Sequence, residues 1–355
     1  MILAREVTAM EKKRHMKRNL LFVGILFLLI YLPGLLMTPQ FVLKHHLGAG
    51  RNAIYSRIAC EPANSVDVLV MGDSESYTSV SPMKLWKENG YTVYAAGQPG
   101  ANLGDTRNVL KVALESQKPK VILLETHSLF RSRNGKINQK QSALAEKLYN
   151  ALPMLRYHNA WKQFFPQRLH ASYKGFNISG KVKPYTGSDD YMNQNQKPDV
   201  IDKENLQDLK AIRKVCKDHN IQLILYSAPS PKNYSMTRNV TLTKLAKKMK
   251  LPYVDLNMKT QELGIDWKTD TRDKGDHLNI SGALKTTAFF QKYLSKNCNL
   301  PDHRKDSLVA SKWNKTYMEY AAVEEKKMSK INEKKNDTPA ETLIVAEKDS
   351  GTLQE

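Results

Sequence analysis

Two residues that lie far apart in the sequence have the types that nucleophilic catalysis requires. Ser74 stands in the stretch MGDSES (71–76), at the end of an apolar run, and His277 stands in DKGDHLN (273–279). A serine hydroxyl is a poor nucleophile until a base takes its proton, and a carboxylate must then hold the other nitrogen of that base. The pattern therefore predicts Ser74 as a nucleophile and His277 as its base.

The loop of His277 offers two acids. Asp273 lies four residues before the histidine, which is far enough for the chain to turn and meet the ring, whereas the side chains of neighbours such as Asp276 tend to point apart. We expect Asp273 to be the acid, with Asp276 as the alternative. Ser74 alone would also suit a helix N-cap, so the prediction depends on a fold that brings the two loops together.

The apolar pattern indicates such a fold. Short apolar runs predict strands at 66–71, 92–96, 121–125, 221–226 and 253–256. The segments between them predict helices at 82–89, 103–116, 200–219, 242–249 and 281–294. Continuous apolar strands that alternate with helices are typical of a parallel sheet covered on both faces. We predict a three-layer α/β/α sandwich whose functional loops gather at the carboxyl ends of the strands.

The N-terminal part of the chain predicts a membrane anchor. Residues 20–37 form an 18-residue apolar run, about 27 Å long as a helix against a hydrocarbon core of roughly 30 Å. The stretch EKKRHMKR before it is basic, so the positive-inside rule predicts a cytoplasmic N-terminus and an exported remainder. A cleaved signal peptide is the alternative, but no small-x-small site follows and the run is long for one.

These features divide the chain into predicted regions. We expect a cytoplasmic basic tail, one transmembrane helix, a linker, an extracytoplasmic domain with an insertion at about 127–200, and a charged, disordered tail that can begin as a helix near Trp313 and Tyr317. Their boundaries are 1–18, 19–38, 39–65, 66–300 and 301–355.

The charge is strongly positive and unevenly distributed. The chain has 55 Lys+Arg against 35 Asp+Glu, a net charge of +20, of which +4 lies in residues 1–20 and −1 in residues 302–355. About +17 therefore remains on the middle of the chain, which favours a polyanionic partner. Export argues against nucleic acid, so we expect an anionic surface polymer or glycan, or anionic lipid.

Cysteine usage excludes a disulfide scaffold and a CxxC-type zinc site, and we predict no metal and no cofactor. Cys60 and Cys298 lie at the two borders of the expected domain, where export would permit a disulfide. Three free thiols, with Cys216 simply buried, fit the sequence equally well.

Over about residues 66–296 the sequence resembles the SGNH (GDSL-type) hydrolase superfamily, whose fold is flavodoxin-like. The first block corresponds to GDSE (72–75), with Glu75 in place of the usual Leu, and the last to DKGDHLNISGA (273–283). The second block corresponds to AAGQPGAN (95–102), in which the resemblance assigns Gly100 an oxyanion-binding amide.

The third block departs from the family. Members carry Gly-x-Asn-Asp after the third strand, where this chain has LETHSL (124–129). Either Thr126, His127 or Asn102 replaces the missing asparagine as an oxyanion donor, or the amides of Ser74 and Gly100 act alone. Loss of one donor typically costs about 2.7–4 kcal/mol of transition-state stabilisation.

The loss of the third block, together with an N-terminal anchor, makes the chain similar to one sub-branch of the family. This sub-branch includes the alginate O-acetylation proteins and the D-alanyl transfer protein of lipoteichoic acid. The stretch LRYHNAW (155–161) is similar to the alginate-type members, although His158 and Trp161 fit an insertion core better than a catalytic role. Lys174, Phe176 and Tyr185 are candidates for a polymer groove, or for an ordinary surface loop.

The resemblance implies a membrane-anchored extracytoplasmic serine esterase or O-acyltransferase. Its substrates would be acyl esters of a cell-surface polysaccharide or teichoic-acid-like polymer, and its partner a membrane-bound O-acyltransferase. The sequence leaves hydrolase and transferase both open. The last block also departs from the family's Asp-x-x-His spacing, because position 274 is Lys and the acid must be Asp273 or Asp276. This departure and the missing Asn keep a second hypothesis open, a non-catalytic binding or assembly subunit of a polymer-acylation complex.

Overall fold

The computed structural model describes residues 2–37, 58, 61–131, 148, 151–157, 173–188, 191–193 and 199–336. The chain forms two compact units. The first unit consists of residues 1–56 and 132–170, and the second of residues 57–131 and 171–355.

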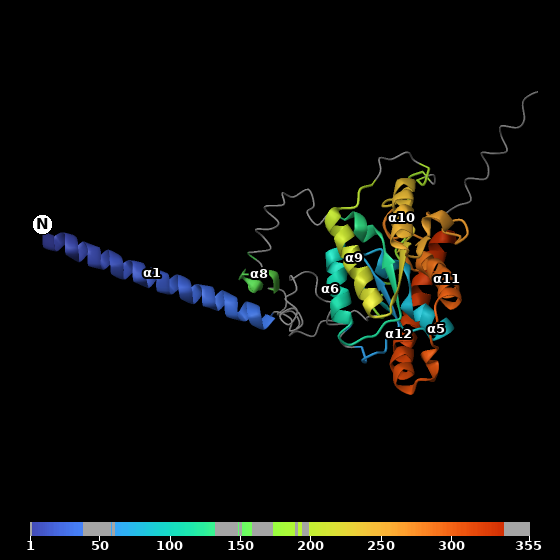
Figure 1. The fold of residues 1–355 in the computed structure, drawn as a ribbon, viewed down its shortest axis with the longest axis horizontal. Coiled ribbons are helices and arrows are strands. Elements are labelled where there is room, and N and C mark those ends of the chain that lie inside the picture. The colour runs from blue at the N-terminus through green and yellow to red at the C-terminus, as the bar shows by residue number, and fades with distance from the viewer. Residues whose placement is uncertain are drawn as a thin grey trace, which may run out of the picture. The chain divides into compact units, whose positions relative to one another are not determined.

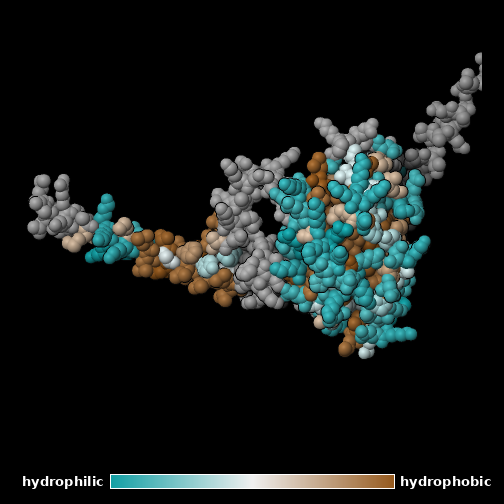
Figure 2. All heavy atoms as spheres, in the orientation of Figure 1, coloured by the Kyte–Doolittle hydropathy of each residue, from teal (hydrophilic) through white to brown (hydrophobic). Residues whose placement is uncertain are grey.

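The first unit contains a long N-terminal helix, α1 (Ile2–Met37). Its stretch Met10–Met37 contains an 18-residue window with a mean hydropathy of 2.6 and is long and apolar enough to cross a membrane, as an anchor or as a signal sequence. Figure 2 shows the apolar side chains along this helix. A short helix, α8 (Pro153–Tyr157), packs against α1 where a Cβ on Gly34 would lie 2.5 Å from the Met154 nitrogen. Part of the predicted insertion thus groups with α1.

The second unit is built on a five-stranded parallel sheet. Its strands are β1 (Val68–Met71), β2 (Val93–Ala95), β3 (Val121–Glu125), β4 (Gln222–Ser227) and β5 (Tyr253–Asp255). The strand order is β2-β1-β3-β4-β5, and every neighbouring pair is parallel. The predicted strands and the predicted sandwich are confirmed.

Helices cover both faces of this sheet. They are α4 (Ser76–Ser79), α5 (Pro82–Asn89), α6 (Leu103–Ala113), α9 (Lys203–Asp218), α10 (Met236–Met249), α11 (Ile280–Asn297) and α12 (Ser307–Asn336). Short 3-10 turns lie at η1 (His127–Phe130), η3 (Asn257–Lys259) and η4 (His303–Lys305). Figure 1 shows α6 and α9 on one side of the sheet and α5 and α11 on the other.

Local sequence signals fix where the helices begin and end. Ser81 caps α5 by accepting a hydrogen bond from the Lys84 amide, Pro82 follows it, and Gly90 ends the helix in the left-handed conformation. Asn279 caps α11 two residues after His277. The central strands are buried on both faces, and Phe290 and Leu294 of α11 pack against them. The sheet edge is thus a rigid support for the loops that follow its strands.

The predicted disorder after residue 300 is wrong for residues 303–336. These residues form η4 and the 30-residue helix α12, in which Trp313, Tyr320 and Ile331 are fully buried. The Trp313 ring lies 5.4 Å from that of Trp86. The Lys/Glu-rich composition suggested disorder, but a few large apolar side chains on one face suffice to dock the helix. Residues 337–355 lie outside the described part.

Two of the three cysteines lie in the described part of the chain. Cys298 is a free, half-buried thiol and Cys216 is a free, buried thiol, whereas Cys60 lies outside the described residues. Burial raises the pKa of Cys216 to about 12, so that thiol is unreactive at neutral pH.

We expect Trp313→Ala to destabilise the second unit by about 3–5 kcal/mol, because it empties a fully buried site under α12. Urea unfolding followed by far-UV circular dichroism would measure the loss. Lys315→Ala, on the exposed face of the same helix, is the matched control and should change stability by about 0.5 kcal/mol or less. Equal unfolding midpoints for Trp313→Ala and the wild type would mean that α12 is not part of the core.

Candidate active site

Three side chains from the two ends of the sheet unit form a chain of hydrogen bonds. The Nε2 atom of His277 lies 2.7 Å from the Oγ of Ser74, and its Nδ1 lies 2.7 Å from the Oδ2 of Asp273. Ser74 and His277 are separated by 203 positions in the sequence. The structure therefore brings together the predicted nucleophile, base and acid.

The loop that carries His277 and Asp273 is tightly held. Thr271 and Leu278 pair across its base, and the Thr271 hydroxyl accepts a hydrogen bond of 2.8 Å from the Gly275 amide. The His277 amide donates to Asp273 Oδ1 at 2.7 Å, so the acid binds both the backbone and the ring of the same histidine. Lys274 adopts a left-handed backbone conformation (φ 64°), which costs energy for a side chain with a Cβ and is typical of constrained functional loops.

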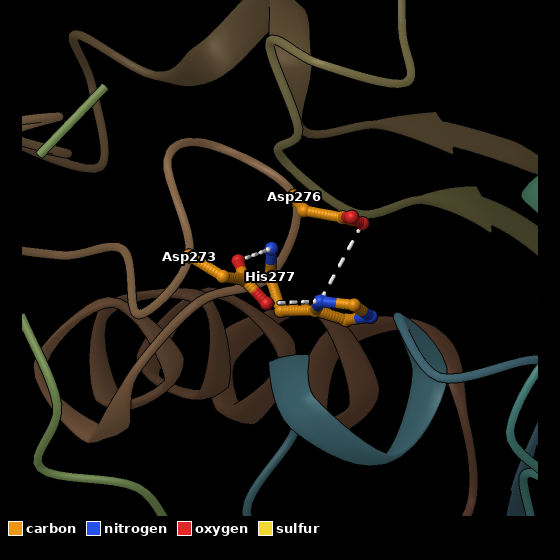
Figure 3. Close-up of side chains that lie close together, drawn as sticks. All are labelled: Asp273, Asp276 and His277. Atoms are coloured by element: carbon orange, nitrogen blue, oxygen red, sulfur yellow. Dashed lines mark hydrogen bonds and ion pairs between the residues drawn. The ribbon is translucent and has the colours of Figure 1, made fainter. Parts of the chain in front are cut away.

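The geometry distinguishes the two candidate acids (Figure 3). Asp276 Oδ1 lies 3.4 Å from His277 Nδ1, farther than Asp273. Asp276 is instead bound by Lys232 at 2.9 Å and by Asn233 at 2.7 Å. Burial would raise the pKa of Asp273, but the hydrogen bonds from His277 outweigh it and lower that pKa. Asp273 is therefore the ionised partner of the ring.

Asp273, Asp276 and His277 also lie close enough to one another for a metal ion, with one ligand atom from each within 4.8 Å of the others. Their contacts explain this proximity without an ion. His277 is shared between Asp273 and Ser74, and Lys232 already balances the charge of Asp276.

Ser74 sits in a compact turn between β1 and α4. A Cβ on Gly72 would lie 2.9 Å from the Cβ of Glu125, so only glycine allows β1 to approach the end of β3 this closely. The Thr78 hydroxyl donates to the Ser74 carbonyl at 2.9 Å and ties the turn to α4. Ser74 is largely buried, with 8% of the residue exposed.

The loop after β2 lies against this turn and carries the predicted oxyanion donors. The Gln98 amide donates to the Gly72 carbonyl at 3.1 Å, and Gly100 follows in the left-handed conformation (φ 61°) that favours glycine. In the described part of the chain, the backbone amides of Ser74 and Gly100 donate no hydrogen bond to another residue. Asn102 caps α6, since its Oδ1 accepts from the Asp105 amide at 3.1 Å.

Thr126 and His127 are engaged in other contacts. The Thr126 hydroxyl is buried, 2.6 Å from that of Ser227 on β4. The Nδ1 of His127 lies 2.9 Å from Glu75 Oε1 and 3.3 Å from Asp73 Oδ2, the carboxylates on either side of Ser74. Both residues therefore act in the packing beneath the nucleophile turn, and this geometry gives neither the position of an oxyanion donor.

A buried charge network lies under Ser74, and sequence reasoning missed it. Arg131 binds Asp73 at 2.5 Å, and Glu125 accepts from the His127 amide at 2.9 Å. Burial, together with the charges of Glu75 and Asp73, raises the pKa of Glu125 well above its usual range, which favours its neutral form. Burial alone would lower the pKa of His127, but Glu75 and Asp73 outweigh it and raise that pKa.

Asn233, in the loop between β4 and α10, joins the two halves of the site. Its Nδ2 lies 2.8 Å from Glu75 Oε1 and 2.7 Å from Asp276 Oδ1. One side chain thus connects the neighbour of Ser74 to the neighbour of His277. A charged residue at the end of an apolar strand, Glu125, was the one signal in the sequence for this network; nothing local marked Asn233.

The residues predicted to line a polymer groove, or to form an ordinary surface loop, lie in two different environments. Lys174 is buried, with its Nζ 2.7 Å from Glu61 and 4.5 Å from the centre of the Trp313 ring. Phe176 is buried in the same apolar cluster under α12. Lys174 and Phe176 therefore belong to the core of the second unit, because their partners lie inside it. Tyr185, by contrast, lines an open cleft. His158 and Trp161 lie outside the described residues.

Comparison with solved structures gives distant likenesses that cover most of the chain. They include a protein from Bacteroides fragilis described as an acylhydrolase (15% identity, TM-score 0.39, 70% of this chain and 97% of that one). A GDSL-like lipase from Bacteroides thetaiotaomicron has 14% identity and a TM-score of 0.38, over 70% of this chain and 99% of that one. A protein from Streptococcus pneumoniae described as a platelet activating factor has 16% identity and a TM-score of 0.39, over 71% of this chain and 96% of that one. No protein-family model and no curated protein matches the sequence. The fold assignment therefore depends on the strand order of the sheet itself.

The raised pKa of His127 predicts a pH dependence of stability. A cationic histidine between Glu75 and Asp73 stabilises the fold fully below the value of a free histidine, about 6.5. That contribution is lost as the pH rises through the higher value in the folded protein. We expect urea midpoints to fall from pH 6 to pH 9 less steeply for His127→Gln than for the wild type.

His219→Gln is the control for this measurement, since His219 is exposed at the end of α9. It should keep the slope of the wild type. The same slope in His127→Gln and the wild type would contradict a cationic His127 beneath the nucleophile turn.

Proposed function

We propose that this chain is a serine esterase or O-acyltransferase of the SGNH (GDSL-type) kind, with Ser74, His277 and Asp273 as its catalytic triad. The single observation that carries the proposal is the hydrogen-bond chain from Asp273 through His277 to Ser74, with 2.7 Å at each step. A hydroxyl, an imidazole and a carboxylate in this order are the parts that acyl transfer through a serine requires.

In the first half of the reaction, the Ser74 oxygen attacks the carbonyl carbon of an acyl ester while His277 Nε2 takes the hydroxyl proton. Asp273 holds the Nδ1 proton and stabilises the imidazolium that forms. When the tetrahedral intermediate collapses, the bond to the alcohol breaks and His277 returns its proton to the leaving oxygen. The acyl group then remains on Ser74.

In the second half, an acceptor hydroxyl attacks the acyl-serine and gives its proton to His277, and Ser74 regains a proton as the acyl bond breaks. Water as the acceptor makes the protein an esterase, and a sugar or polyol hydroxyl makes it a transferase. Both outcomes use the same three residues and the same intermediate.

We assign the oxyanion to the amides of Ser74 and Gly100. Both donate to no other group within the described residues. The third donor of the family, an asparagine after β3, is replaced here by residues that serve the buried charge network. With one donor fewer, the reaction loses about 2.7–4 kcal/mol of stabilisation, which an activated acyl ester would tolerate.

The proposed location of the protein at the membrane is supported by α1 and by the basic residues that precede its apolar run. We propose that α1 is an uncleaved anchor with a cytoplasmic N-terminus, since eight residues of basic character precede its apolar run. The sheet unit would then act outside the membrane on acyl esters of a cell-surface polysaccharide or teichoic-acid-like polymer. In the sub-branch that the sequence resembles, the partner is a membrane-bound O-acyltransferase, and we propose the same class of partner here.

The first test is labelling by a fluorophosphonate probe, which reacts with an activated serine. We expect the full chain to be labelled, and labelling to be lost in Ser74→Ala and in His277→Ala, because the nucleophile or its base is removed. Ser329→Ala, on the exposed part of α12, is the control and should label like the wild type. A folded wild-type protein without any labelling would instead support a non-catalytic binding or assembly subunit.

The second test separates the two acids. Asp273→Asn should lower kcat/KM for p-nitrophenyl acetate by about 10²–10⁴-fold, since it removes the carboxylate that orients the imidazole. Asp276→Asn should lower it about tenfold or less, because Asp276 contacts Lys232 and Asn233 more closely than the ring. The reverse order of the two effects would assign the catalytic acid to Asp276.

A further inference from the structure

The loop of Asp273 and His277 is flanked by an extended segment that carries lysines. The Lys274 amide donates to the Lys183 carbonyl at 3.0 Å, and the Lys183 amide donates to the Thr271 carbonyl at 3.1 Å. Two residues earlier, the carbonyl of Lys181 accepts from the Asn279 side chain at 3.1 Å. Lys181, Lys183 and Lys274 are all exposed. The backbone therefore places three exposed lysines beside the catalytic loop.

Helix α12 extends this positive surface. A Cβ on Gly180 would lie 2.9 Å from the Cβ of Lys327, so the helix runs directly beside the extended segment. Burial lowers the pKa of Lys327, and the like charges of Lys330 and Lys181 lower it further. Repulsion of this kind arises where cations gather without enough anions to balance them.

The acids near the catalytic loop do not neutralise these lysines. Asp273 is bound to His277, with Arg272 at 3.8 Å, and Asp276 is bound to Lys232. Within the described residues, Lys183 and Lys274 form no ion pair. We call Lys181, Lys183, Lys274, Lys327 and Lys330 the basic track.

An open cleft of about 960 Å³ lies beside the basic track. Its lining includes Tyr185, Trp267, Lys268 and Lys334, with Asp266 as the acid among them. Tyr185 connects the cleft to the site, because a Cβ on Gly275, in the catalytic loop, would lie 2.9 Å from its ring. Aromatic side chains offer flat apolar faces to sugar rings, and the lysines offer charge to phosphates or carboxylates.

We propose that the basic track and the adjoining cleft bind an extended polyanion, so that an acyl ester on this polymer reaches Ser74. The inference deepens the proposed function and rests on it for the role of Ser74. A polymer chain fits better than a membrane surface, because the lysines follow an extended segment and lead past a cleft into the catalytic loop. The recognised chemistry is a repeat of phosphate or carboxylate groups on a sugar or polyol backbone.

The test measures binding by the full chain in neutral-lipid nanodiscs, with Ser74→Ala to prevent turnover. The probes are three fluorescent oligomers: poly(glycerol phosphate), polygalacturonate and uncharged dextran. We expect either or both anionic oligomers to bind at low salt and to be released as salt rises, with dextran at least tenfold weaker. The better anionic probe identifies phosphate or carboxylate as the preferred repeat.

The decisive variant is the triple change Lys181→Glu, Lys183→Glu and Lys330→Glu, which should weaken binding of the anionic oligomer at least tenfold. The matched control is Lys244→Glu, Lys247→Glu and Lys248→Glu, exposed residues near the end of α10. This end leads into β5 and thus lies at the amino-terminal edge of the sheet. The control has the same change in net charge, so it should bind within about threefold of the parent protein. Circular dichroism melts verify that both variants fold.

Equal loss in the two triple variants would overturn the proposal, because binding would then follow net charge alone. Equal affinity for dextran would also overturn it. Displacement of the oligomer by phosphatidylglycerol vesicles at matched phosphate, but not by unlabelled oligomer, would mean that the surface binds lipid headgroups instead. Fluorophosphonate labelling of the wild type, measured in parallel, separates the two proposals: track-dependent binding without labelling would remove the catalytic role and keep the polyanion site.

Discussion

The site depends on a single imidazole that must contact two partners at once. The His277 ring contacts Ser74 Oγ, in the turn after β1, through its Nε2 and contacts Asp273 Oδ2, in its own loop, through its Nδ1. Both distances are 2.7 Å. Hydrogen bonds of this length tolerate little displacement, so both loops have to be held rigidly. The parallel sheet supplies that rigidity, because β1 is a central strand paired on both sides and Asn279 starts α11 two residues after His277.

This arrangement buries three carboxyl groups next to the nucleophile turn, of which Glu125 favours the neutral form. Asp73, Glu75 and Glu125 are almost completely buried, and His127 and Arg131 partly balance them. An unpaired buried charge is strongly destabilising, whereas a fully hydrogen-bonded network fixes one geometry. Thr126 and His127, the residues that follow β3, thus pack against β4 and against the acids on either side of Ser74.

Helix α12 has two separate roles on its two faces. Trp313, Tyr320 and Ile331 close an apolar cluster with α5 and with Phe176, which makes the helix part of the folded unit. Lys327 and Lys330 lie on the side of the extended segment around Gly180. The same docking that buries the aromatic rings therefore adds positive charge beside the catalytic loop.

Sequence alone determined the strands, most of the helices and the three residues of the hydrogen-bond chain, because apolar periodicity and the local motifs around Ser74 and His277 are encoded within short stretches. It favoured Asp273 over Asp276 as the acid but left both open, since side-chain direction in a loop depends on the backbone and on Lys232 and Asn233, which come from elsewhere. It also underestimated how far α12 extends, because the few buried side chains of this helix gain their stability only from partners across the fold. Contacts between distant segments, including the network under Ser74, were settled only by the tertiary structure, because burial sets both their partners and their protonation.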